Sequence, residues 1–211
     1  MKTIRNGCKL QPKARDINVG DQIEQLDQII KETDCKEYFN KTFITEGMRT
    51  LLSKGMARLA GKSNDTVFHL KQAMGGGKTH LMVGFGLLAK DAELRNAQIG
   101  SVTYKNRATP HQHSAFDQHS TFDYHSTIPY QSDFGNAKVA AFNGRNNPNT
   151  YLWGEIAKQL GKESLFKDYW EAGAKAPDEQ AWSQLFAGDD PILILLDEMP
   201  PYFHYYSTQV L

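Results

Sequence analysis

The sequence predicts an α/β protein built on a parallel sheet, and two observations lead to this class. Short apolar or β-branched runs alternate with segments of helical periodicity, in the order strand, helix, strand, helices, strand. Connections of this kind place successive strands parallel to one another, joined by crossovers. The last run, residues 192–196, contains only Ile and Leu, which is typical of a strand covered on both faces.

Composition and charge exclude several classes of protein. The 211 residues carry 24 Lys and Arg against 24 Asp and Glu, so there is no overall basic field to bind nucleic acid or an anionic membrane. Two cysteines, Cys8 and Cys35, are too few for a disulfide scaffold and match no metal motif. No secretory signal is visible, and the longest uncharged apolar stretch, 81–89, is too short to span a bilayer. We therefore expect a cytoplasmic protein with no membrane partner.

The first 64 residues precede the predicted sheet. Residues 1–17 lack periodicity and are expected to form a leader, and 18–64 a helical N-terminal segment. One apolar stripe begins at Val19 and continues to Ile30. A second helix is expected from an N-cap at Thr45 to about residue 60, with Gly61 ending it.

Residues 65–211 are expected to form the core domain. Its first strand is predicted at 66–70, and a nearly all-apolar helix from Lys78 to about residue 96 follows a run of glycines. After a strand at 138–142, Asn147 as N-cap and Pro148 in the first turn predict a helix that ends at Gly161. The remaining predicted elements are helical pieces at 165–170 and 180–186, a turn at 188–191 and the strand at 192–196.

A stretch at about 101–136 interrupts this core. It has no periodicity, and residues 113–130 repeat a six-residue pattern that begins His-Ser. We interpret it as a low-complexity, disordered insertion without chemistry. An alternative is metal binding by its histidines, His111, His113, His119 and His125.

The glycine-rich segment at 75–79 predicts a phosphate-binding loop. Gly75, Gly76 and Gly77 would let backbone N–H groups converge on a phosphate chain, and Lys78 would supply a charge for the β- and γ-phosphates. Thr79 would bind Mg²⁺, and the following helix would add its dipole. The general pattern places a glycine at position 72, where this chain has Gln72.

An acidic pair supports the same interpretation. Asp197 and Glu198 directly follow the last strand, at the edge where open α/β sheets bind ligands. Asp197 would hold Mg²⁺, and Glu198 would orient and deprotonate the attacking water. The two motifs together predict a P-loop nucleotide-binding fold that uses ATP and Mg²⁺. A glutamate after the aspartate favours the division that contains AAA-type and helicase-like ATPases.

Longer stretches then indicate a family. Residues 71–80, 141–148, 152–156 and 195–203 resemble the domain of unknown function 499 ATPases, which are large prokaryotic AAA-type proteins often encoded beside DNA methyltransferases and helicases. The resemblance covers about 18–98 and 134–209. It implies ATP binding and hydrolysis through Lys78, Thr79, Asp197 and Glu198, with His80 closing the loop motif, and a role near DNA.

The expected P-loop core is incomplete at its C-terminus. Related ATPases have further strands, and the strand that should join 66–70 to 192–196 is missing if their order applies. Three hypotheses follow: an ATPase that retains nucleotide binding, a truncated non-enzymatic remnant that binds at most nucleotide or a partner, and a chain completed by a C-terminal polypeptide. Related ATPases also form homo-oligomeric rings.

Of the other polar residues, Arg145 is expected at the surface, or near a phosphate or a partner. Asn143 and Asn147 are expected in turns and caps.

Overall fold

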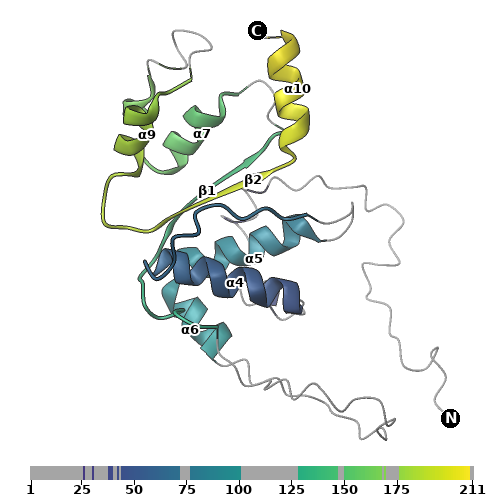
Figure 1. Ribbon diagram of the computed structural model, residues 1–211, viewed down its shortest axis with the longest axis vertical. Helices are drawn as coiled ribbons and strands as arrows, with labels where there is room; N and C mark the ends of the chain where they lie inside the picture. The colour runs from purple at the N-terminus through teal and green to yellow at the C-terminus, as the bar shows by residue number, and fades with distance from the viewer. Residues whose placement is uncertain are drawn as a thin grey trace, which may run out of the picture.

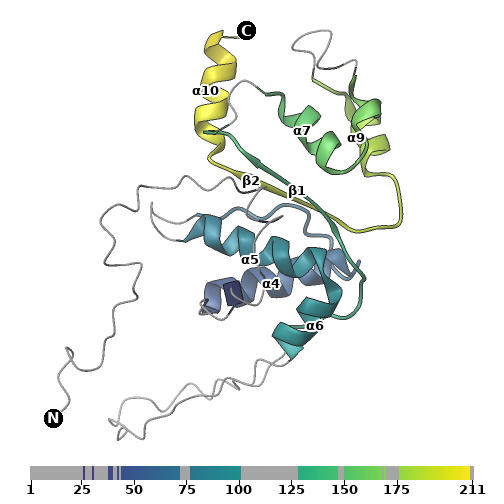
Figure 2. The same cartoon turned by 180° about the vertical axis from the view of Figure 1, so that it is seen from behind.

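The computed structural model describes residues 26, 30, 38–39, 42, 44–71, 77–100, 128–146, 150–167, 169 and 176–209. Two parallel strands lie between two groups of helices. The elements are α4 (Glu46–Leu59), α5 (Lys78–Lys90), α6 (Ala92–Gly100), β1 (Lys138–Asn143), α7 (Leu152–Gln159), the 3-10 helix η2 (Glu163–Leu165), α9 (Glu179–Phe186), β2 (Ile192–Asp197) and α10 (Met199–Gln209). Helices α4, α5 and α6 lie on one side of the sheet and α7, α9 and α10 on the other (Figure 1), as the view from behind also shows (Figure 2). The predicted α/β class and parallel pairing are confirmed.

The register of the sheet fixes the direction of each backbone group. Lys138 pairs with Ile192 and Asn143 with Asp197, so both strands end at the same edge. The N–H of Lys138 donates to the carbonyl of Pro191 at 2.8 Å, and that of Gly144 to Asp197 at 2.9 Å. Because backbone groups alternate in direction along a strand, those of Ile192, Ile194 and Leu196 point away from β1.

The two outer edges of this sheet differ. On the β1 edge, the amide of Gln159 accepts from the N–H of Ala141 at 2.8 Å and donates to its carbonyl at 2.9 Å. This side chain therefore satisfies a residue that would otherwise offer both groups to another strand. Among the residues that the structure describes, no strand pairs with the outer edge of β2.

Apolar side chains form a core on each face of the sheet. One cluster joins α4 and α5 to the sheet and includes Leu52, Met56, Leu87, Leu88 and Leu195. The other joins α7, η2 and α9 to the sheet and includes Ala140, Ile156, Ala157, Phe166 and Leu185. Helices on both faces bury the strands of a parallel sheet in this way.

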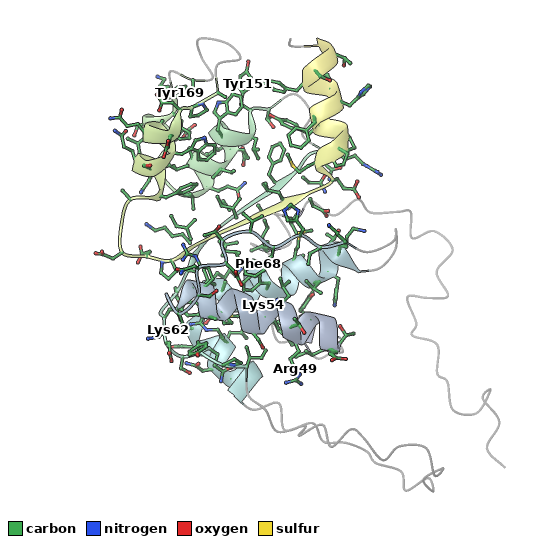
Figure 3. The ribbon with its side chains drawn as sticks, in the orientation of Figure 1. Arg49, Lys54, Lys62, Phe68, Tyr151 and Tyr169 are labelled. Carbon is green, nitrogen blue, oxygen red and sulfur yellow. The ribbon has the colours of Figure 1, made fainter. Side chains whose placement is uncertain are left out.

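The prediction of a strand at 66–70 is wrong. These residues belong to neither a helix nor a strand, and no backbone hydrogen bond among the described residues joins them to β2. Phe68 and Leu70 pack against the α4–α5 cluster, with Phe68 between these helices and the sheet (Figure 3), whereas Val67 is 69% exposed. A β-branched composition favours a strand only where a neighbouring strand provides hydrogen bonds.

Other predicted boundaries also need correction. The helix predicted from residue 78 to 96 is two helices, because Asp91 adopts an extended backbone and its carboxylate caps α6 by accepting from the N–H of Leu94 at 2.8 Å. The helix after β1 begins at Leu152, so the predicted cap at Asn147 does not start it, and Asn147 and Pro148 themselves lie outside the described residues. The last strand is not covered on both faces along its whole length, since Leu196 is 43% exposed.

Several predicted caps and bounds of helices and strands are confirmed. Thr45 caps α4 by accepting from the N–H of Met48 at 3.2 Å, and Gly61 and Gly161 have positive φ after their helices. The predicted strands at 138–142 and 192–196 each extend one residue further, and the helix predicted at 180–186 is α9. In the helix predicted from Val19, the described Leu26 and Ile30 are helical and buried.

The predicted insertion at about 101–136 lies only partly within the described chain. Residues 101–127 lie outside it, and within 128–136 Ile128, which is 3% exposed, and Phe134 pack against the α4–α5 cluster. Arg95 of α6 holds this segment. Its guanidinium is completely buried and donates to the carbonyls of Gln131, Phe134 and Gly135 at 2.5, 2.6 and 2.9 Å.

Candidate functional site

The predicted loop and acidic pair meet at the end of the sheet. Gly77 caps α5 with φ of 76°, a conformation that a glycine adopts at little cost, so Lys78, Thr79 and His80 form the first turn of the helix. The hydroxyl of Thr79 donates to Oδ2 of Asp197 at 2.6 Å, although the two residues are 118 positions apart. The N-terminus of α5 and the carboxyl end of β2 are therefore joined directly.

Asp197 is nearly buried, and its carboxylate is held from two sides. It is 6% exposed, and while Oδ2 accepts from Thr79, Oδ1 accepts from the backbone N–H of Glu198 at 2.9 Å. Thr79 has one hydroxyl hydrogen, which this contact uses, so the lone pairs of its oxygen remain able to bind a cation. A hydroxyl and a carboxylate are the hard oxygen donors that Mg²⁺ prefers, so this pair fits that ion.

Glu198 occupies a constrained position between β2 and α10. Its φ is 50°, a left-handed conformation that costs free energy for a residue other than glycine. The turn after β1 lies against it, because a Cβ added to Gly144 would come within 2.6 Å of the carbonyl oxygen of Glu198 and 2.7 Å of Cβ of Tyr202. Gly144 thus permits the contact that brings the ends of β1 and β2 together.

An arginine reaches Glu198 from the same turn. Nη2 of Arg145 lies 3.2 Å from Oε2 of Glu198, with the two side chains 54% and 40% exposed. The carboxamide oxygen of Asn143 shapes the turn by accepting from the N–H groups of Arg145 and Asn146 at 3.0 and 3.1 Å. The predicted turn role of Asn143 is confirmed. Arg145 is at the surface, as expected, but its ion pair with Glu198 was not predicted.

A signal for this ion pair was present in the sequence. Arg145 stands two residues after a predicted strand and Glu198 directly after another. Since parallel strands end at one edge of the sheet, the two side chains could have been expected to lie together.

A tyrosine beneath the site fixes the base of α10. Tyr202 is 3% exposed, its hydroxyl accepts from the N–H of Leu152 at 3.1 Å, and its ring packs edge-on against Phe142. Burial raises the pKa of Tyr202, and the Leu152 contact acts in the opposite direction. This neutral side chain ties α10, which starts directly after Glu198, to α7 and to β1.

Other predicted site residues lie outside the described part of the chain. They are Gly75, Gly76, Asn147 and the histidines His111, His113, His119 and His125. Within the ranges that the structure does describe, no three or more His, Cys, Asp or Glu side chains come together as a metal cluster. None of the described helices combines the length and apolar character needed to cross a membrane.

Comparison with known proteins gives one match. Residues 9–111 match the family model described as the DUF499 N-terminal domain. This range includes Lys78, Thr79 and His80 and ends before β1, β2, Asp197 and Glu198. No curated protein and no solved structure matches the chain. The match supports the resemblance over the first half of the chain, and its description assigns no activity.

Proposed function

We propose that this chain binds ATP with Mg²⁺ and hydrolyses it, as a P-loop module of the AAA-type division. The observation that carries the proposal is the 2.6 Å hydrogen bond from Thr79 to Asp197. A helix N-terminus attracts phosphate through its N–H groups and its dipole. Here that terminus carries a lysine and a threonine, and a buried carboxylate from the neighbouring strand faces it.

Each residue has a separate part in binding. Backbone N–H groups of Gly75, Gly76 and Gly77 would receive the phosphate oxygens, and Lys78 would pair with the β- and γ-phosphates. Thr79 and Asp197 would hold Mg²⁺. The ion would supply positive charge that offsets the charge of the phosphates.

Hydrolysis depends on Glu198. Its carboxylate would accept a proton from a water that attacks the γ-phosphorus in line, giving ADP and inorganic phosphate. The ion pair with Arg145 holds Oε2 of that carboxylate, so Glu198 would accept the proton through Oε1 or after this contact opens.

The same ion pair supports a second candidate function. If Arg145 keeps Glu198 engaged, the chain binds nucleotide without multiple turnover. Both functions require Mg·ATP binding and differ only in whether phosphate is released.

Calorimetric titration with Mg·ATP tests the shared step. Lys78→Ala should weaken binding at least tenfold, and Lys54→Ala, which removes an exposed lysine of α4 (Figure 3), should leave it unchanged. Equal affinity of Lys78→Ala and the unchanged chain would refute the proposal. Steady release of phosphate that Glu198→Gln abolishes would favour hydrolysis over binding alone.

Location and partners remain predictions. We propose a cytoplasmic location, where ATP is supplied. A role near DNA and homo-oligomers follow from the family resemblance alone, and a complementing polypeptide follows from the further strands that related ATPases have.

A further inference from the structure

A second set of contacts, separate from the bond to Asp197, holds the first turn of α5. The ring of Tyr38 stacks on that of His80, with centroids 4.6 Å apart, and the Tyr38 hydroxyl donates to the carbonyl oxygen of His80. Oγ1 of Thr42 lies 3.1 Å from Nε2 of His80 and 2.7 Å from the carbonyl oxygen of Tyr38. Tyr38, Thr42 and His80, which we call the Tyr38 cluster, therefore join two residues of the N-terminal segment to α5.

The number of donor hydrogens available fixes the direction of these hydrogen bonds. The carbonyl oxygen of Tyr38 can only accept, so Thr42 uses its one hydroxyl hydrogen there. The Thr42 oxygen must then accept from His80, which means that Nε2 of His80 carries a hydrogen. The bonds run from His80 to Thr42, from Thr42 to Tyr38, and from Tyr38 back to His80, forming a closed ring.

The surface of α5 is shaped to receive the phenol ring. A Cβ added to Gly84, one turn after His80, would come within 3.1 Å of the Tyr38 hydroxyl and 2.6 Å of Cε of Met48. Burial raises the pKa of Tyr38 to about 12, although Thr42 and the backbone of Gly84 act in the opposite direction. The hydroxyl consequently stays protonated near neutral pH and remains a hydrogen-bond donor.

His80 directly follows Thr79, so two adjacent residues connect α5 to different parts of the fold. Thr79 bonds to Asp197 of β2, and His80 bonds to Tyr38 and Thr42. The first turn of α5 is thus held between the sheet and the N-terminal segment. A change on the His80 side shifts the oxygen of Thr79 because both belong to one turn of helix.

We propose that Tyr38, Thr42 and His80 are positioning residues that set the oxygen of Thr79 for Mg²⁺-dependent nucleotide binding. The inference rests on the proposed function and deepens it, since it gives the N-terminal segment a part in the same site. Tenths of an ångström decide whether an oxygen fits the strict geometry of Mg²⁺, whereas a phosphate chain held by several N–H groups tolerates such shifts.

The test compares ATP affinity in Mg²⁺ with affinity in EDTA, for the full chain and its variants. Tyr38→Phe keeps the ring and removes one hydrogen bond, Thr42→Val removes another, and His80→Gln offers an amide donor that His80→Ala lacks. Tyr169→Phe, which removes a hydroxyl on the far side of the sheet (Figure 3), is the matched control. Melting of the apo proteins identifies any variant that does not fold.

The expected result is a loss of about tenfold in Mg·ATP affinity for Tyr38→Phe, Thr42→Val and His80→Ala. Affinity in EDTA should stay unchanged, and His80→Gln should recover at least half of the loss on a logarithmic scale. The inference is wrong if the unchanged chain binds Mg·ATP and the folded variants bind it equally well. It is also wrong if the variants lose as much ATP affinity in EDTA as in Mg²⁺. In both cases the proposed function stands. If the unchanged chain does not bind Mg·ATP, both are wrong.

Discussion

Replacing Arg95 with Met should strongly destabilise the fold without touching the candidate site. Arg95 is completely buried, and among the described residues no carboxylate is hydrogen-bonded to it. Its guanidinium instead donates to backbone carbonyls of two separate segments. The first is the end of α5, with Leu88 at 2.8 Å and Ala89 at 3.3 Å. The second is 131–135, at 2.5 to 2.9 Å. Its Cζ also lies 3.8 Å from the centre of the Phe134 ring. Burial lowers the pKa of Arg95, and Asp91 opposes that shift. Arginine is so basic that it stays charged in proteins.

The magnitude follows from what the substitution leaves behind. Leu88 and Ala89 are at the end of α5, where carbonyls have no partner within the helix. In Arg95→Met the carbonyl of Ala89 keeps the N–H of Ala137 as a donor at 2.8 Å, but methionine cannot donate to Leu88 or to 131–135. Each buried carbonyl left without a donor costs about 1–3 kcal/mol. Part of this cost is recovered because the variant no longer buries a charge. We expect a net loss of about 3 kcal/mol, which lowers Tm by roughly 6–12 °C for a chain of this size.

Thermal and urea unfolding of Arg95→Met measure this loss. The matched control is Arg58→Met, because Arg58 is exposed and donates to the single carbonyl of Ser63 at 3.0 Å. It should cost no more than about 0.5 kcal/mol. Arg95→Lys should recover less than half of the loss, since one ammonium cannot reach both segments. The reasoning fails if Arg95→Met melts within 2 °C of Arg58→Met, a margin of about 1 kcal/mol.

Three further predictions address the turn after β1, the edge of β2 and the ionisation of Tyr38. Gly144→Ala should lower the free energy of unfolding in urea by about 1–3 kcal/mol, because the added Cβ would lie 2.6 Å from the carbonyl oxygen of Glu198. The control, Gly135→Ala, places its Cβ in open space and should leave the free energy of unfolding unchanged. Equal losses in the two variants would contradict this prediction. In hydrogen exchange followed by NMR, the backbone amide of Ile194 should exchange faster than that of Leu195, because the Leu195 amide faces β1 and the Ile194 amide faces away from it. Equal protection of the two amides would mean that another strand pairs with the outer edge of β2. Because burial raises the pKa of Tyr38 to about 12, its contribution to stability should be fully present below about pH 10 and be lost as the pH rises towards 12. In urea unfolding at several pH values, Tyr38→Phe should make the alkaline loss of stability shallower, and an unchanged slope would exclude Tyr38 as one of its sources.

Patterns that depend on neighbouring residues were read correctly from the sequence. The apolar stripe of α4, its cap at Thr45 and the two runs that form β1 and β2 are local signals. The meeting of Thr79 and Asp197 was also predictable, because a glycine-rich loop before a helix and an acidic pair after a buried strand are the two halves of one phosphate-binding pattern.

Features that depend on distant partners were not predictable in this way. Residues 66–70 have the composition of a strand, but strand formation requires a paired edge. Arg95 resembles any other arginine of an amphipathic helix, since only the folded chain brings carbonyls from 88–89 and 131–135 around it. The contact of Tyr38 with His80 likewise joins two helical segments whose relative placement no periodicity specifies.

The central claim is that Thr79 and Asp197 act as one unit in binding Mg·ATP. Calorimetric titration of the unchanged chain, Thr79→Val, Asp197→Asn and the double variant measures their coupling. We predict that each single substitution weakens binding at least tenfold and that the double variant is no weaker than the poorer single one. Losses that simply add, or single variants that bind Mg·ATP as tightly as the unchanged chain, would contradict the account.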